Sequence, residues 1–158
     1  MTSESPTPPT SNMPPQPDPA LSRLQPLVGT WVMIGRTLGS EAYDVNGKVT
    51  ITWMPGGHFL TQQGEMTVQG TAFHSLEVVG YDPATDVFSS IVFSSMDGVP
   101  ADYFWDVQGD VVTHWTAGSK YTGKFSTDRR TLIGGWSPDA GVEATPANTY
   151  EVTMRRIK

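Results

Sequence analysis

One short stretch of the sequence carries residue types that could hold or act on a small molecule. The segment DYFWDVQGDVVTHW, residues 102–115, is predicted to form two strands joined by a Gly-Asp turn with glycine first. That turn places Trp105 opposite His114, with Tyr103 on the same face, because side chains alternate along a strand. A histidine among aromatic rings predicts a polar anchor in an apolar pocket. The same pattern is also typical of a core histidine held by one hydrogen bond.

The other face of this hairpin carries Asp102 and Asp106 beside Phe104 and Trp115. Because the first face has no carboxylate, we expect the first face to line the interior of the protein. Phe104 and Trp115 are large for an outer face, and they could cover a contact between two copies of the chain. A homodimer is therefore one expected assembly.

A second hairpin, within residues 71–95, could bring a carboxylate inside. Its aromatic-rich face includes Glu77 and Tyr81, and we expect Phe93 to join this face and to point inward. A buried carboxylate must be paired or neutralised. In one dry pocket, Glu77 and His114 could act as acid and base in a cyclase, isomerase or hydrolase reaction. The pattern leaves open the alternative in which Glu77 faces solvent.

The composition argues against several other kinds of chemistry. The chain has no cysteine, which excludes thiolate metal sites and cysteine nucleophiles. Its three histidines, His58, His74 and His114, fall on separate predicted strands, with the last two on opposite sides of the wall, so no metal site is predicted. No GxSxG elbow accompanies the serines. We expect neither a metal nor another cofactor, and the residues do not decide whether the protein is an enzyme.

The charge of the chain bears on its partners. A net charge of −6 and a pI near 4.8 argue against nucleic acid and membrane surfaces, because phosphate binding needs a concentrated basic face. No apolar run approaches the roughly 18 residues of a membrane span, and no signal peptide is recognisable. We expect a cytoplasmic protein whose partner is a small molecule.

The order of elements predicts one all-β domain behind an N-terminal tail. Residues 1–18 are rich in Pro, Ser and Thr, which is typical of a disordered arm. Asp18 and Pro19 favour a short helix that ends at Pro26. The rest of residues 19–158 is typical of strands and turns, which predicts a closed up-and-down antiparallel β-barrel with a helical plug. Ten strands are expected, at about 30–38, 47–54, 58–68, 71–81, 87–95, 101–108, 111–117, 120–126, 131–137 and 148–157.

The segment LVGTW, residues 27–31, follows the predicted helix and resembles the opening of the calycins, the superfamily of lipocalins and fatty-acid-binding proteins. The resemblance implies that Gly29 lets the chain turn sharply into the first strand and that Trp31 plugs the closed end. It also implies a cation from the final strand over the ring of Trp31. Alternation along TYEVTMRRIK favours Arg156 for this role, with Arg155 as the alternative if the register shifts.

The segments GYDP, residues 80–83, and SSMDG, residues 94–98, are similar to segments of an uncharacterised bacterial calycin-like family that also carries LVGTW. A more distant resemblance is to nitrobindin-type proteins, which bind haem iron through a late histidine, whereas this sequence has none after His114. The resemblance implies a small, mostly apolar molecule in the barrel lumen. The alternatives are a small-molecule enzyme and a binder of haem or nitrogen oxide. The residues expected at the ligand are Tyr81, Phe93, Tyr103, Trp105, His114 and Glu77.

Overall fold

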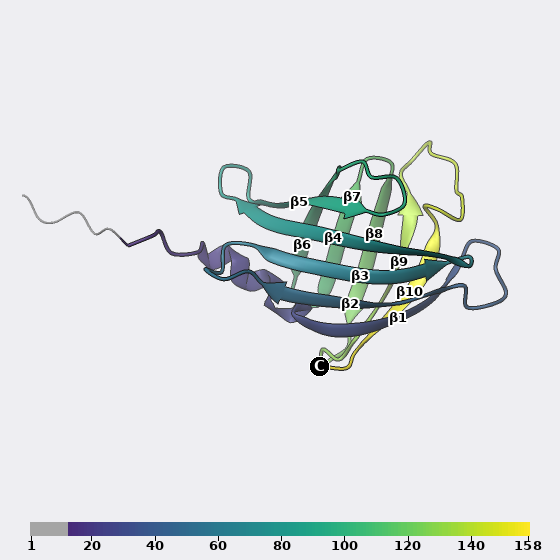
Figure 1. Ribbon diagram of the computed structural model, residues 1–158, viewed down its shortest axis with the longest axis horizontal. Coiled ribbons are helices and arrows are strands. Elements are labelled where there is room, and N and C mark those ends of the chain that lie inside the picture. Colours follow the sequence, from purple (N-terminus) through teal and green to yellow (C-terminus); the bar gives the residue numbers. More distant parts are fainter. Residues whose placement is uncertain (1–12) are drawn as a thin grey trace, which may run out of the picture.

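A computed structural model describes residues 13–158 and shows ten antiparallel strands closed into a barrel (Figure 1). Each strand pairs with the next in the chain, and the tenth pairs with the first, so the predicted closed up-and-down barrel is confirmed. Of the arm predicted at residues 1–18, residues 1–12 lie outside the described part. The strands are β1 (Gly29–Thr37), β2 (Val45–Trp53), β3 (Leu60–Val68), β4 (Thr71–Asp82), β5 (Val87–Ser94), β6 (Ala101–Gln108), β7 (Val111–Thr116), β8 (Ser119–Phe125), β9 (Thr131–Pro138) and β10 (Tyr150–Arg156).

The alternation of side chains along each strand separates an inner from an outer face. In β8, Tyr121 and Phe125 are buried, whereas the lysines at positions 120 and 124 are exposed. A two-residue period of this kind gives a closed sheet a continuous apolar interior. Over residues 13–158, no helix has the length and apolar character needed to cross a membrane.

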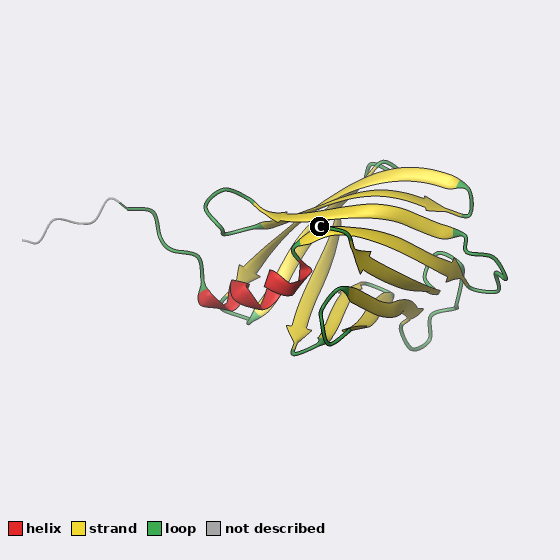
Figure 2. Cartoon of the chain, turned by 90° about the horizontal axis from the view of Figure 1, so that it is seen from below, coloured by secondary structure: helices red, strands yellow, loops and turns green. Residues whose placement is uncertain are grey.

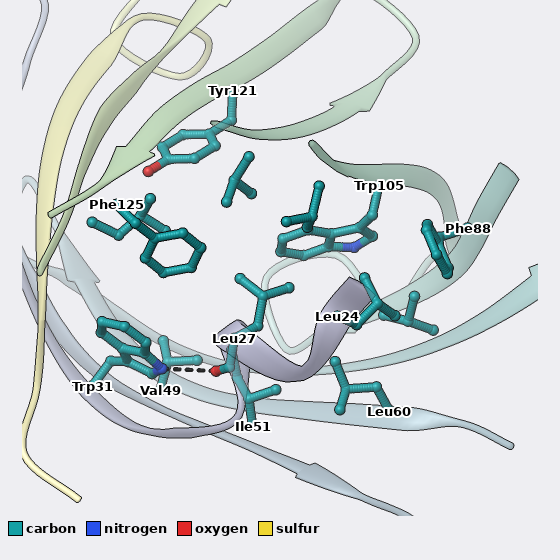
Figure 3. Packing of buried hydrophobic residues seen from close by; sticks show 14 of the residues in the cluster. Leu24, Leu27, Trp31, Val49, Ile51, Leu60, Phe88, Trp105, Tyr121 and Phe125 are labelled. Atoms are coloured by element: carbon teal, nitrogen blue, oxygen red, sulfur yellow. Dashed lines mark hydrogen bonds between the residues drawn. The ribbon is translucent and has the colours of Figure 1, made fainter. Parts of the chain in front are cut away.

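A short 3₁₀ helix, η1 (Pro19–Leu27), covers one end of the barrel (Figure 2). The carboxylate of Asp18 caps it by accepting a hydrogen bond from the backbone N–H of Ala20 at 2.9 Å. A 3₁₀ helix has three residues per turn, so residues three apart share a face. Leu21, Leu24 and Leu27 are spaced in this way, and all three are buried against the barrel interior. Figure 3 shows Leu24 and Leu27 among the core residues of the strands. The helix continues through Pro26, so the stop predicted at that proline was wrong.

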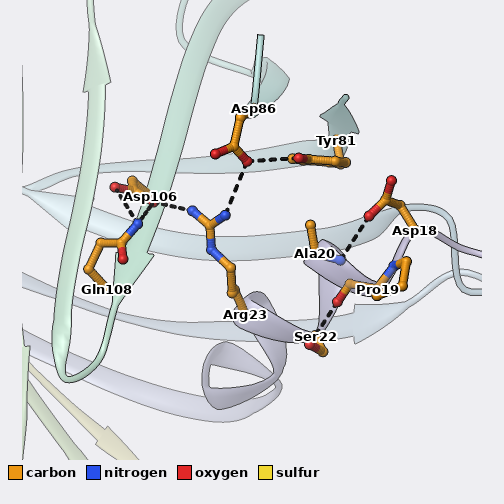
Figure 4. Close-up of polar contacts among 9 residues, drawn as sticks. All are labelled: Asp18, Pro19, Ala20, Ser22, Arg23, Tyr81, Asp86, Asp106 and Gln108. Atoms are coloured by element: carbon orange, nitrogen blue, oxygen red, sulfur yellow. Dashed lines mark hydrogen bonds and ion pairs between the residues drawn. The ribbon is translucent and has the colours of Figure 1, made fainter. Parts of the chain in front are cut away.

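Polar contacts hold η1 against the strands (Figure 4). The guanidinium of Arg23 donates to Asp106 of β6 at 2.6 Å and to Asp86, beyond the end of β4, at 3.3 Å. Asp86 also accepts from the Tyr81 hydroxyl at 2.7 Å. The same guanidinium lies 4.8 Å from the ring centre of Phe88. The plug is therefore attached to both β6 and the β4–β5 connection.

The junction of η1 with β1 depends on Trp31 and Arg156, which are paired across β1 and β10. The Arg156 guanidinium lies 4.2 Å from the ring centre of Trp31, so Arg156 rather than Arg155 occupies this position. Arg156 also donates to the carbonyl oxygens of Pro26, at 2.6 Å, and Val28. The Trp31 indole N–H donates to the Leu27 carbonyl at 2.9 Å (Figure 3).

Gly29 makes this close approach sterically feasible. Its φ of 144° is in a range that side chains rarely adopt, and a Cβ at this position would lie 2.6 Å from the Lys158 carbonyl oxygen. Any larger residue would therefore push the start of β1 away from the end of the chain that pairs with it.

We expect Arg156→Ala to lower the free energy of unfolding by about 2–4 kcal/mol. The variant loses the cation–π contact and leaves the Pro26 and Val28 carbonyls without their charged donor. Urea unfolding measures the change. Arg155→Ala is the matched control, since Arg155 is exposed, and it should change stability by less than about 0.5 kcal/mol. Equal losses in the two variants would contradict the role given to Arg156.

Candidate functional site

A row of ring-bearing side chains crosses the inner face of the barrel from β4 to β10. Each member is the cross-strand partner of the next, so seven strands contribute one residue each. Trp105 and His114 are stacked, with ring centres 3.7 Å apart and planes 17° from parallel. Trp136 has ring-centre distances of 5.3 Å to His114, 6.0 Å to Tyr121 and 6.3 Å to Tyr150. In strand order the aromatic row is Tyr81, Phe88, Trp105, His114, Tyr121, Trp136 and Tyr150.

A second row on the inner face is built from flexible side chains. It runs from β10 through β1, β2 and β3 to β4, again by direct cross-strand pairing. Gly47 sits in the middle of this row, and a Cβ there would lie 2.5 Å from the sulfur of Met66. The missing side chain therefore leaves space for the neighbouring methionines. In order the methionine row is Met154, Met33, Gly47, Met66 and Phe73.

A partly open cavity of about 170 Å³ lies in the lumen between the two rows. Leu27 and Trp31 line it at the plugged end, and Phe73 and Tyr150 line it towards the opposite end. An apolar cavity of roughly 150 Å³ in another protein admits benzene, whereas drug-sized ligands occupy roughly 300–1,000 Å³. The space suits a molecule of about one ring. The remaining lining residues are Met33, Val49, Ile51, Gln62, Met66, Ser75, Trp105, His114, Tyr121, Leu132, Trp136, Val152 and Met154.

A buried carboxylate supports the cavity wall. Glu77 is only 3% exposed, and its Oε1 accepts hydrogen bonds from Ser90 Oγ at 2.6 Å and Trp105 Nε1 at 2.7 Å. His114 Nε2 lies 3.0 Å from the same oxygen. Gln62 Nε2 donates to Oε2 at 3.2 Å. Donors from β3, β5, β6 and β7 thus converge on one side chain of β4.

These contacts decide the charge of Glu77 and the tautomer of His114. Burial by itself raises the pKa of Glu77, but the charge interaction with His114 and the hydrogen bonds from His114, Ser90 and Trp105 outweigh burial and hold that pKa below its ordinary value of 4.5. The carboxylate is therefore ionised at neutral pH and can only accept hydrogen bonds, so His114 Nε2 carries a proton. Within residues 13–158, His114 Nδ1 has no hydrogen-bond partner.

The tyrosines around the cavity are neutral donors. Burial raises the pKa values of Tyr103, Tyr121 and Tyr150 above the ordinary value of 10.0. The Tyr121 hydroxyl is buried and has no partner in residues 13–158. Gly123 makes space for it, because a Cβ there would lie within 2.3 Å of this hydroxyl.

The structure brings together four of the six predicted ligand residues and separates the other two from them. Trp105 and His114 line the cavity, and Tyr103 packs on His114 with ring centres 5.0 Å apart. Glu77 lies inside the barrel, which resolves the alternative left open for it, and it contacts His114 rather than lining the cavity. Tyr81 lies at the plugged end of the barrel, where its hydroxyl donates a hydrogen bond to Asp86.

The inward placement predicted for Phe93 was wrong. Phe93 pairs with Leu76 and is 45% exposed on the outer face. The reason is the length of the turn, which is residues 83–86 between the paired Asp82 and Val87. With this turn, odd-numbered residues of β4 pair with even-numbered residues of β5, so Phe93 is carried outward.

The remaining residues that the sequence placed outside the barrel do lie on its outer face. His74 is exposed on the outer face, on the opposite side from His114. Among residues 13–158, no three potential ligands of a metal ion come together. Phe104 and Trp115 stack on the outer face with ring centres 5.7 Å apart, and the homodimer expected from them stays a prediction.

Sequence reasoning missed Gln62, Ser90, Tyr121, Trp136 and Tyr150. Ser90 and Gln62 reach Glu77 only through the registers of β3, β4 and β5. The aromatic residues of β8, β9 and β10 could have been recognised, because their spacing places one ring per strand on one face. Aligning these rings with His114 requires the registers of three further strand pairs, which the sequence does not show.

We expect Glu77→Gln to lower the free energy of unfolding by about 1–3 kcal/mol at pH 7, because the ionised acceptor of four contacts is lost. A folded-state pKa below the ordinary value contributes stability above pH 4.5, and this contribution is lost as the pH falls through the folded-state pKa. The difference between wild type and variant should therefore shrink from pH 7 towards pH 3. Urea unfolding across this range measures it.

The exposed Glu65 of β3 provides the control for this pH series. Glu65→Gln should change stability by less than about 0.5 kcal/mol at every pH. A constant gap between wild type and Glu77→Gln from pH 7 to pH 3 would show that ionisation of Glu77 does not stabilise the fold.

We expect Tyr121→Phe to raise the free energy of unfolding by up to about 1–2 kcal/mol, since it removes a buried hydroxyl without a partner. Thermal unfolding of the ligand-free protein provides the measurement. Tyr43→Phe, at a position 62% exposed, is the control and should be neutral. A loss of stability in Tyr121→Phe would mean that the hydroxyl has a hydrogen-bond partner in solution.

Comparison with known proteins places the chain in a family and supports the fold. The crystal structure of Rv2717c from M. tuberculosis is similar, with a TM-score of 0.59 and 14% sequence identity over 90% of this chain and 100% of that chain. At this identity the likeness shows the fold alone. No curated protein matches the sequence. A family model described as "Protein of unknown function (DUF1579)" matches residues 16–132, and the chain therefore belongs to the DUF1579 family.

Proposed function

We propose that the protein binds a small, mostly apolar molecule in the barrel lumen. The observation that carries this proposal is the cavity of about 170 Å³ between the aromatic row and the methionine row. A concave, mostly apolar space with a few placed polar groups is typical of small-molecule sites. Within it, His114 supplies a ring nitrogen without a partner in residues 13–158.

The size of the cavity limits the choice of ligand. A site well below roughly 300 Å³ favours a molecule of about one ring over a drug-sized one. The haem alternative receives less support, because the space is small and His114 Nε2 already donates to Glu77. Membership of the calycin superfamily, which the LVGTW segment suggested, stays a prediction.

A second candidate is acid–base catalysis at His114, and the Glu77–His114 contact of 3.0 Å favours it. A carboxylate that accepts from one imidazole nitrogen leaves the other nitrogen as a base for a substrate proton. In this arrangement Glu77 would be a positioning residue, because it does not line the cavity. Binding and catalysis would use the same space and the same histidine.

The methionines of the protein provide a direct test of binding. Met33, Met66 and Met154 line the cavity, whereas Met13, Met54 and Met96 are 72%, 41% and 63% exposed. In protein labelled with ¹³C at the methionine methyls, we expect toluene to shift the three cavity methyl signals by its ring current. The three exposed methyl signals should stay in place, and so serve as controls in the same spectrum.

A pair of variants sharpens this test. Val152→Phe fills the cavity from β10 and should abolish the toluene shifts, at a cost in stability of about 1–3 kcal/mol from overpacking. Ile133→Phe adds the same ring on the outer face, at a position 60% exposed, and should leave the shifts unchanged. If toluene moved exposed and cavity methyls alike, or moved none in wild type, the binding proposal would be wrong.

A further inference from the structure

We infer that the lumen is built for a small aromatic alcohol of the phenol class, whose hydroxyl donates a hydrogen bond to His114 Nδ1. This inference rests on the proposed function, because it names the chemical class of the molecule in the same cavity. It goes beyond that function by requiring both a ring and a hydrogen-bond donor in the ligand.

The requirement for a donor comes from the arrangement around Glu77. Its Oε1 takes protons from Ser90 and Trp105, and an ionised carboxylate has none to give, so His114 must donate from Nε2. In the neutral form of His114, the proton sits on Nε2 and Nδ1 keeps a lone pair, and this is the form that the ligand would bind. His114 lines the cavity, so we take this lone pair as the acceptor for the hydroxyl of the ligand.

The His114 ring has little freedom to exchange its two nitrogens. Trp105 stacks on it at 3.7 Å, and Tyr103 and Trp136 pack on it at 5.0 and 5.3 Å. A ring flip would break the contact with Glu77 and leave that buried carboxylate short of a donor. The acceptor is thus organised before any ligand arrives, which reduces the entropy lost on binding.

The requirement for a ring comes from the two walls. Trp105, Tyr121 and Trp136 present aromatic surfaces that favour an offset or edge contact with another ring. On the other side, the sulfurs of Met33, Met66 and Met154 can approach a ring edge, a favourable contact for a thioether. A single ring also matches a cavity of about 170 Å³.

Three probes of one ring separate these requirements. Toluene has the ring alone, p-cresol adds a hydroxyl donor, and 4-methylanisole has the same oxygen without a donor. We expect p-cresol to bind wild type at least about tenfold more tightly than either of the others, because only p-cresol can donate a hydrogen bond to His114 Nδ1. Titration of the cavity methionine methyl signals gives the three dissociation constants.

Two variants and one control assign the preference to His114. In His114→Phe, which keeps a stacked ring and removes the acceptor, the preference for p-cresol over toluene should fall to within about threefold. His74→Phe on the outer face should retain it. In Glu77→Gln, an amide can pair with either tautomer of His114, so the preference should also decrease even where His114→Phe fails to fold.

A spectroscopic readout needs no variant. In protein with ¹⁵N-labelled histidine, the His114 signals should report a proton on Nε2 and none on Nδ1. p-Cresol should shift the Nδ1 signal, whereas toluene should not. A proton on Nδ1 in the free protein at pH 7 would overturn the inference.

The results distinguish a preference for phenols from small-molecule binding in general. If p-cresol, toluene and 4-methylanisole all bind with similar affinity, the phenol class is wrong and small-molecule binding stands. If none of the three shifts a cavity methyl signal, both are wrong.

Discussion

The carboxylate of Glu77 must be supplied with hydrogen-bond donors, because it is ionised and almost completely buried. Four strands other than its own meet this need, through Gln62, Ser90, Trp105 and His114. Two of these donors are rings on directly paired positions of adjacent strands, and they point at the same oxygen while lying nearly parallel, 17° apart. The buried charge thus fixes the proton of His114 on Nε2 and holds the edges of both stacked rings in place.

The two rows give the lumen walls of different stiffness. The aromatic row consists of side chains with few rotatable bonds, and its neighbouring rings restrain one another. Methionine has three rotatable bonds and a polarisable sulfur, so the methionine row can adjust to the shape of a guest. The first wall can therefore orient a ligand while the second accommodates substituents. The unpartnered Tyr121 hydroxyl costs stability in the empty barrel, which is a common property of binding sites.

Much of the architecture could be predicted, because a period of two and the turn residues are local signals. The Gly-Asp turn fixed the pairing of Trp105 with His114, and alternation along β10 identified Arg156. Phe93 was assigned to the wrong face, because a change of one residue in the length of a turn moves every side chain of the following strand to the opposite face. The sequence of the hairpin could not decide whether Glu77 faces inward, because alternation sorts residues onto two faces without showing which face is inside. Its donors come from strands whose registers are properties of the closed sheet.

The contact between Arg156 and Pro26 joins residues 130 positions apart in the chain. During synthesis the N-terminal residues leave the ribosome first, yet the second edge of β1 and the contact of η1 with Arg156 are completed only when β10 has emerged. Until then β1 has an open edge, and the growing sheet offers unpaired backbone groups to other chains. The barrel therefore stays open at the edge of β1 until its tenth strand has been made, and this exposed edge is a route to aggregation on the ribosome.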